Sequence, residues 1–395
     1  MSEFQASNFK KENGGTPDLL GKTDLTSPYF FVPPSGTTAE RPESCAAGTL
    51  RFNTDIGTLE VYRGDPIGWW AIQRRESQYL GGGTGSNAGT GTRALFAGGY
   101  TQQSSPYPTT DTIEFLTIST LGNSQDFGNL ITSGVIFASV SDRTRCLFAG
   151  NNGGNTSQDN TIEFVTFAST GNASDFGDLS ETRGGPGDLG CGSATRGLIG
   201  GGYTTSPTVF KDTIDYVTIS ETGNAVDFGN LTQARAALSA CSSTTRGIWM
   251  GGYHPTQVNI MDSVEIATLG NAVDFGNLQD GDGDAERMRV SGASNSTRGL
   301  CIGGLSPNIM NAIDFITIAT RGNGQDFGDL TETKYHTAAT ADPTRAVVFC
   351  GTSDAPIRNT IEFVTIATTG NATDFGDATA AKFQAGGASN GHGGL

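Results

Sequence analysis

One phrase recurs six times along this 395-residue chain, at intervals of about fifty residues, and this repetition limits the fold more than any other feature. The best copy runs from Thr195 to Leu231 and reads TRGLIGGGYTTSPTVFKDTIDYVTISETGNAVDFGNL. Every copy contains an Arg, then a Gly-Asn pair, then an Asp-Phe-Gly tripeptide (DFG). Because this layout is fixed, each local motif is interpreted first as a part of the repeat.

The arginine and the DFG aspartate occur once per copy, and their equal number predicts one ion pair at each boundary between repeats. The arginines are Arg93, Arg145, Arg196, Arg246, Arg298 and Arg345. The aspartates are Asp126, Asp175, Asp227, Asp274, Asp326 and Asp374. Such a pair would be at least partly buried, so losing one partner would be destabilising. A ring of arginines that binds an anion is the alternative.

Each copy contains four segments with the character of β-strands. In the best copy these are TRGLIGG, TIDYVTI, NAVDF and the segment ARAALSACSS before the next Arg. Four antiparallel strands in about fifty residues are the content of one propeller blade. We therefore expect an all-β, six-bladed propeller over residues 76–395. A further candidate strand between Tyr79 and Gly91 leaves seven blades open, and it would let the first and last segments pair; the same stretch is alternatively a Gly/Ser linker.

The glycines of the repeat are interpreted as turn residues. The Gly-Asn pair predicts a hairpin turn with positive φ, so Gly223→Ala would be destabilising by about 1 kcal/mol. DFG also occurs in the magnesium loop of protein kinases, but the other kinase motifs are missing and a catalytic group is not needed six times. We expect the Phe to pack between blades and the Gly to supply a turn.

The N-terminal region differs in composition from the repeats. Residues 1–28 are polar and without periodicity, and they predict an extended arm. Residues 29–75 contain TLRFN, TLEVY and GWWAI, three short strands of a small β meander. A hairpin that merely caps the repeat domain is the alternative interpretation of this module.

The wording of both parts resembles known families. VPPSGTTAERP, AGTLRFNTD, GTLEVYRG and a closing Trp resemble the small β module near the N-termini of tailed-phage structural and fibre proteins. The GGY after the first strand resembles Kelch-type propellers, although most copies lack the usual Trp. The whole repeat phrase is more similar to Kelch-like repeats in virion proteins of marine tailed phages that infect cyanobacteria.

This resemblance implies a virion structural protein, present in multiple copies and made in the cytoplasm of the bacterial host. The N-terminal region would bind other virion proteins, with Phe30, Phe31, Trp69 and Trp70 as attachment candidates. The propeller would belong to a tail, collar or fibre appendage that attaches to a glycan or protein of the host surface. The alternative is an architectural connector, or a capsid or neck decoration, without a receptor.

The loops that follow GGY vary between copies, and loops displayed by a rigid scaffold are common binding elements. Tyr107, Phe210, His254 and Arg358 are the contact candidates in them. Residues 81–395 carry sixteen Lys and Arg against thirty Asp and Glu, and this acidic balance argues against nucleic acid as a partner. Neither a signal peptide nor a run of about eighteen apolar residues is present, so we expect no membrane insertion.

No residue pattern indicates an enzyme, a cofactor or a metal site. His254, His336 and His392 are scattered, without paired cysteines. Asp280, Asp282 and Asp284 alternate as in a calcium loop, but the required Gly and Glu are replaced by Ala285 and Ser291; a solvated loop is expected, with calcium binding as the alternative. The six cysteines are expected to be reduced, with Cys191 and Cys241 as small core fillers.

Arg196→Ala is expected to lower the melting temperature more than it changes the binding of any partner, because the repeat arginine is interpreted as structural. Thermal unfolding followed by circular dichroism measures this effect. An unchanged melting temperature would contradict the structural role.

Overall fold

The computed structural model describes residues 34–42, 45–55, 58–64, 68–71, 92–152, 158–185, 189–279, 286–353 and 356–395. The chain divides into two compact units, residues 1–80 and 81–395, which are described separately. The described residues are almost entirely β-strand and loop, with one short 3-10 helix. They include no helix that is long and apolar enough to cross a bilayer.

The first unit contains a four-stranded sheet in the order β1-β2-β3-β4. Its elements are β1 (Ser35–Gly36), the helix η1 (Thr38–Glu40), β2 (Leu50–Asn53), β3 (Thr58–Tyr62) and β4 (Trp69–Ala71). The three expected strands are present, and β1 adds a parallel partner for β2. Glu60 is fully buried and forms ion pairs with Arg41 and Arg51.

The attachment candidates are only partly visible. The ring of Trp69 lies 5.4 Å from that of Tyr62, and Trp70 pairs with Val61 through the backbone of β4. The expected arm, Phe30, Phe31 and the side chain of Trp70 lie outside the described residues.

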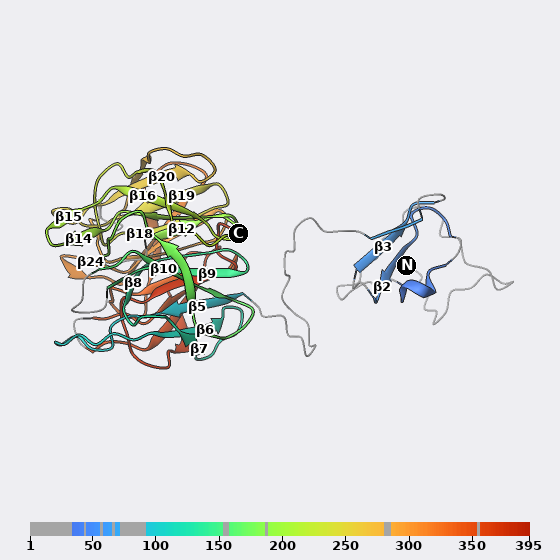
Figure 1. The fold of residues 1–395 in the computed structure, drawn as a ribbon, viewed down its shortest axis with the longest axis horizontal. Coiled ribbons are helices and arrows are strands. Elements are labelled where there is room, and N and C mark those ends of the chain that lie inside the picture. Colours follow the sequence, from blue (N-terminus) through green and yellow to red (C-terminus); the bar gives the residue numbers. More distant parts are fainter. Residues whose placement is uncertain are drawn as a thin grey trace, which may run out of the picture. The chain divides into compact units, whose positions relative to one another are not determined.

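The described residues of the second unit form six four-stranded antiparallel sheets, an arrangement compatible with a propeller-like fold (Figure 1). The innermost strands are β8 (Val135–Ser141), β12 (Gly190–Gly192), β18 (Ser239–Ser242), β22 (Ser291–Ser294), β28 (Ala338–Ala341) and β32 (Gly386–Ser389). The second strands begin at the repeat arginine: β5 (Arg93–Ala97), β9 (Arg145–Asn152), β13 (Arg196–Gly200), β19 (Arg246–Met250), β23 (Arg298–Ile302) and β29 (Arg345–Phe349).

The two outer strands of each sheet follow. The third strands are β6 (Thr112–Thr117), β10 (Thr161–Thr166), β16 (Thr213–Thr218), β20 (Ile260–Glu265), β26 (Ala312–Thr317) and β30 (Thr360–Thr365). The fourth strands carry DFG: β7 (Gln125–Asn129), β11 (Ser174–Asp178), β17 (Val226–Asn230), β21 (Val273–Asn277), β27 (Gln325–Asp329) and β31 (Thr373–Asp377). Two small hairpins lie between second and third strands: β14 (Tyr203–Thr205) with β15 (Thr208–Phe210), and β24 (Leu305–Ser306) with β25 (Asn308–Ile309).

One sheet combines strands from opposite ends of this unit. The late strand β32 pairs with β5, giving the order β32-β5-β6-β7, and Asn390 accepts a hydrogen bond from the Arg93 backbone, 297 positions away. Each innermost strand contacts the next along the chain, and β32 contacts β8 again. The candidate strand between Tyr79 and Gly91 lies outside the described residues.

The prediction of ion pairs between the repeat arginines and the DFG aspartates is wrong. The DFG aspartates are exposed, and the arginines instead donate to backbone carbonyls of the neighbouring sheet. Arg196, for example, lies 3.0 Å from the carbonyl oxygens of both Ile266 and Ala267. Its guanidinium also lies 5.0 Å from the ring centre of Tyr216 in its own sheet. Backbone carbonyl oxygens and carboxylates both accept hydrogen bonds from guanidinium N–H groups, so a carbonyl oxygen takes the place of the expected aspartate here.

The Gly-Asn pair forms a contact between sheets. In the third sheet, Gly223 donates to the Phe176 carbonyl at 2.8 Å, and the Asn224 side chain accepts from the Asp178 N–H at 3.1 Å. The same pair of bonds occurs in all six sheets, including Gly122 to Phe375 and Asp377 to Asn123. These bonds satisfy the outer edge of each fourth strand, an edge that would otherwise be open to aggregation.

The expected positive φ of the Gly-Asn glycine is absent at Gly223, but it is present in the other five copies, with φ from 151° to 159°. Each of these glycines has open space around it. Gly229 of DFG has φ +148°, and a β-carbon there would collide with the Gly270 carbonyl of the next sheet. It lies in a strand at an irregularity of register rather than in a turn. The DFG Phe does pack between sheets: Phe228 is 2% exposed.

The cysteines behave as expected. No disulfide joins the six, all of which lie in the described residues. Cys191 and Cys241 are buried, and their sulfur atoms fill the space above Gly247 and Gly299 of the neighbouring second strands.

Gly229→Ala is expected to lower the free energy of unfolding by about 2 kcal/mol or more, because it combines a positive φ with a backbone collision. Gly223→Ala, the matched control, should change it by no more than about 0.5 kcal/mol, as for a surface position. Urea unfolding at neutral pH measures both. Equal losses would show that the close approach at DFG is not what requires glycine.

Candidate functional site

The second unit has two ends with different loops. The loops between second and third strands and the connections from each fourth strand to the next innermost strand meet at one end, here called the loop face. They are joined by isolated bridges such as Ala236 to Tyr253 and Tyr335 to Thr352. The hairpin β14–β15 and β24 lie on one side of this unit and the C-terminus on the opposite side (Figure 1).

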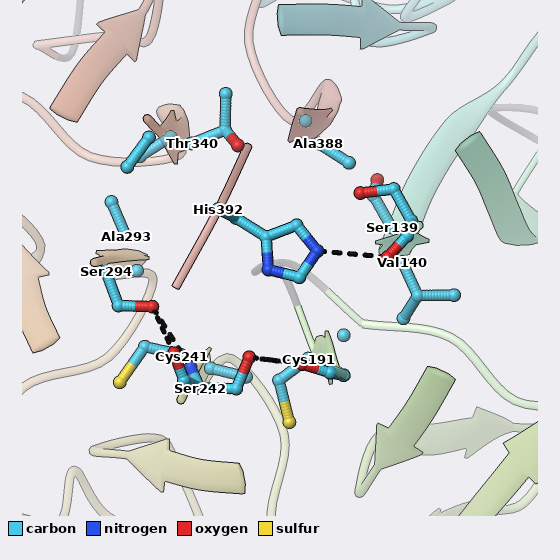
Figure 2. Close-up of a pocket in the computed structure, with 18 residues that line it drawn as sticks. Ser139, Val140, Cys191, Cys241, Ser242, Ala293, Ser294, Thr340, Ala388 and His392 are labelled. Carbon is cyan, nitrogen blue, oxygen red and sulfur yellow. Dashed lines mark hydrogen bonds between the residues drawn. The ribbon is translucent and has the colours of Figure 1, made fainter. Parts of the chain in front are cut away.

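The six innermost strands surround a small cavity, and His392 points into it (Figure 2). Nε2 of His392 donates to the Ser141 carbonyl at 3.0 Å, and Nδ1 accepts from the Gly394 N–H at 3.1 Å. Burial lowers the pKa of His392, which favours this neutral form. The space open to water-sized molecules is about 40 Å³, enough for a few waters, whereas ligand pockets measure about 300–1,000 Å³. The cavity is therefore too small to be a ligand site.

Buried ion pairs support the loop face in five of the six sheets. A basic side chain just before the innermost strand meets an acidic side chain of the third strand. The pairs are Arg183–Asp215 (3.0 Å), Arg235–Asp262 (2.7 Å), Lys382–Glu114 (2.5 Å), Arg287–Asp314 and Lys334–Glu362. Four of these carboxylates, those of Asp215, Asp262, Glu362 and Glu114, also accept an N–H from the second residue after the fourth strand of the neighbouring sheet, as Asp262 does from Thr232. These pairs fix the connections that form the face.

Four residues on these connections have left-handed backbone conformations although none is glycine. They are Ala237, Arg289, His336 and Gln384, with φ between 54° and 60°. Their backbones are linked across the sheets: Arg289 donates to Ala237, His336 to Arg289, and Gln384 to His336, at 2.7, 3.2 and 2.9 Å. Non-glycine residues in this region are strained and are often found at functional sites.

Arg289, His336 and Gln384 lie in the larger of two groups of side chains built around aromatic rings, here called the Tyr335 cluster. Its members are Tyr100, Tyr107, Arg289, Tyr335, His336, Phe383 and Gln384. Ring centres are 5.2 Å apart for Tyr100 and Phe383 and 4.7 Å apart for Tyr335 and His336. Burial lowers the pKa of His336 well below its usual value, and the charge of Arg289 lowers it further. Burial, with smaller contributions from Tyr203 and Tyr107, raises the pKa of Tyr100.

The second group, the Phe210 cluster, contains Tyr203, Phe210, Tyr253 and His254. The Phe210 ring lies 4.6 Å from His254 and 5.8 Å from Tyr253. Two of the loop residues selected from the sequence are thus in contact. Tyr107 lies beside Tyr100 in the other cluster at 6.1 Å, with 43% of its surface exposed.

Arg358, the fourth loop residue, is held by its surroundings. Its Nε lies 2.8 Å from Glu332 and its guanidinium donates to Ser353 at 3.2 Å. It is therefore separate from both clusters in its contacts, and its ion pair links its own loop to the connection between β27 and β28.

Arg289, Tyr335, Phe383 and Gln384 were not predicted from the sequence, and His336 was considered only as a metal ligand and rejected as one. A signal exists in the repeats: the residue two positions after the buried Arg or Lys is Ala237, Arg289, His336 and Gln384 in four copies. Its residue type changes from copy to copy, whereas the residue two positions earlier is Arg or Lys in all four.

No protein-family model matches this chain, and neither does any curated protein. Among the described residues, no three His, Cys, Asp or Glu side chains are placed to hold a metal ion. The Asp280–Asp284 loop lies outside the described residues.

The remaining sheet lacks the buried cation. Gly134 stands where the other sheets have Arg or Lys, and Glu163, 4% exposed, accepts an N–H from Ile131 at 2.7 Å. Burial raises the pKa of Glu163. Burial acts in the same direction on Glu114, but the Lys382 charge and several hydrogen bonds outweigh it, so the pKa of Glu114 is lowered.

Opposite pH dependence is expected for the two glutamates. The raised pKa of Glu163 stabilises the fold at low pH, and this contribution is lost as pH rises through the folded pKa; the contribution of Glu114 is lost as pH falls. Between about pH 4 and 7, Glu163→Gln should become more stable relative to wild type as pH rises. The deficit of Glu114→Gln relative to wild type should be constant over most of this range and should shrink as pH falls below about 4. Glu114→Gln should lose about 3 kcal/mol or more at neutral pH, because Lys382 stays buried without its partner. Urea unfolding between about pH 3 and 7 tests both trends, and a Glu114→Gln deficit that grows as pH falls, or a Glu163→Gln deficit that grows as pH rises, would contradict the assignment.

Proposed function

We propose that residues 81–395 form a closed six-bladed, Kelch-like propeller that acts as a non-enzymatic binding platform. The contacts of the innermost strands, which lead from β8 to β32 and back to β8, support closure. The paired glycines followed by Tyr in three copies support the relation to Kelch repeats.

The observation that carries the binding role is the distribution of variable side chains. The strands, the DFG Phe and the contacts between sheets, together called the frame, are the same from sheet to sheet. Side chains that differ from sheet to sheet collect on the loop face, where Arg289, His336 and Gln384 occupy equivalent strained positions. A rigid scaffold with variable residues on one face is how such folds bind partners.

We further propose that the chain is a virion protein of a tailed phage, with residues 1–75 attached to the particle and the propeller contacting the host surface. The resemblance of the N-terminal module to phage fibre proteins supports this assignment. The apolar residues of that module support a packing partner, since Leu50 and Leu59 are 47% and 38% exposed.

Binding of the purified, fluorescently labelled chain to a panel of marine cyanobacterial strains tests the receptor role. Adsorption to at least one strain, and inhibition of phage infection of that strain, are the expected results. Heat-unfolded chain is the control for non-specific adsorption. Adsorption to no strain would sink the receptor role and favour the architectural connector or decoration.

A further inference from the structure

We propose that the Tyr335 cluster is a saccharide-binding site in which aromatic rings stack on sugar rings and Arg289 and Gln384 bind sugar hydroxyls. This inference rests on the proposed binding role and specifies the chemistry of the receptor. Its basis is the set of side chains that the strained connections bring together on the loop face.

Arg289 is the polar group that the fold leaves available there. In the described part of residues 81–395, three arginines make no ion pair or side-chain hydrogen bond to another described residue: Arg143, Arg289 and Arg321. Arg143 and Arg321 are exposed at the end opposite the loop face. Arg289 is half-buried, and its guanidinium lies 5.5 Å from the Tyr335 ring centre. Its planar set of N–H donors can bind two neighbouring hydroxyls at once.

His336 gives a second, independent indication of a ligand. It is 8% exposed, and its Nε2 lies 2.9 Å from the side-chain nitrogen of Gln384. If that amide nitrogen donates, the neutral ring carries its proton on Nδ1, which has no hydrogen-bond partner. A buried donor without an acceptor is destabilising by about 1–3 kcal/mol. Because Nδ1 is covered by its neighbours, a sugar hydroxyl would supply that acceptor by displacing one of the side chains around it.

The exposed ring of Tyr107 and the half-buried rings of Tyr100 and Tyr335 supply the stacking surface, and the buried rings of His336 and Phe383 lie beneath them. Tyr335, His336, Phe383, Tyr100 and Tyr107 are in successive contact across two neighbouring sheets. Pyranose C–H groups carry a slight positive charge and pack on the negative faces of aromatic rings. Tyr hydroxyls, an amide and an imidazole around such rings are neutral hydrogen-bonding groups, and they match a ligand dense in hydroxyls.

Isothermal titration of the full chain with cellotetraose, chitotetraose and tetragalacturonate tests the site. We expect at least one of them to bind. Arg289→Gln and Gln384→Ala should each weaken that binding at least about tenfold, or about 1.4 kcal/mol. Arg321→Gln, which removes an exposed arginine from the opposite end, should bind like wild type. Stronger binding of tetragalacturonate than of the neutral sugars would assign Arg289 to a carboxylate.

Several outcomes would overturn the proposal. Binding of none of the three saccharides would do so, as would saccharide binding that both variants retain, or binding of a tetraglutamate peptide in place of all three. Unchanged melting of the variants by circular dichroism shows that a loss of binding is not unfolding.

Cell binding separates this inference from the proposed function. Periodate oxidation of host cells destroys vicinal diols, so it should abolish adsorption of the chain if the chain binds cellotetraose or tetragalacturonate, whose residues carry such diols. If the chain binds chitotetraose, whose internal residues lack them, digestion of the cells with chitinase is the treatment instead. Equal adsorption to treated and untreated cells would overturn the inference and leave the receptor role intact. Saccharide binding without adsorption to any strain would retain the site and remove the receptor role.

Discussion

The contact on which the second unit depends is the clamp that each sheet places on the loop of the next. A backbone N–H at the Gly-Asn pair, the Asn side chain and the repeat arginine all reach across one boundary, as in Gly223, Asn224 and Arg145. Each hydrogen bond contributes only about 1 kcal/mol net, but every sheet gives and receives the same set. Because the acceptors are mostly carbonyls, the clamp fixes backbone positions and leaves the outward side chains unconstrained.

This arrangement separates the frame from the face. The frame uses a DFG Phe at 2% exposure, a glycine with no room for a β-carbon, and buried ion pairs. The loop face consists of positions whose side chains take no part in the repeated contacts between sheets. Arg289 and His336 are held by their backbones in a strained conformation; the Arg289 side chain stays half-buried, whereas the His336 ring is buried against Phe383. Strain of this kind persists only where the surroundings determine the backbone.

Much of the frame could be predicted from the sequence, because repetition reveals the parts that every sheet needs. The four strands per copy, the buried Phe of DFG and the packing of Cys191 follow from periodicity and apolar runs. The partner of Arg196 could not be predicted, because every residue has a backbone carbonyl and the sequence does not show which one accepts. Opposite charge favoured the DFG aspartate, which is the wrong acceptor. The strained positions were missed for a related reason, since the conformation at His336 is imposed by neighbouring sheets and leaves no mark on residue type.

The sheet β32-β5-β6-β7 has a consequence for the order in which this chain folds. Strand β5 is synthesised early, but its neighbour β32 leaves the ribosome only after almost all of the other sheets. During that interval the edge of β5 is unpaired, next to buried side chains such as Leu95 and Phe96. Contacts between positions so far apart in sequence slow folding and expose the chain to aggregation. The DFG aspartates, one on each outer strand, would also keep such half-assembled chains from joining edge to edge.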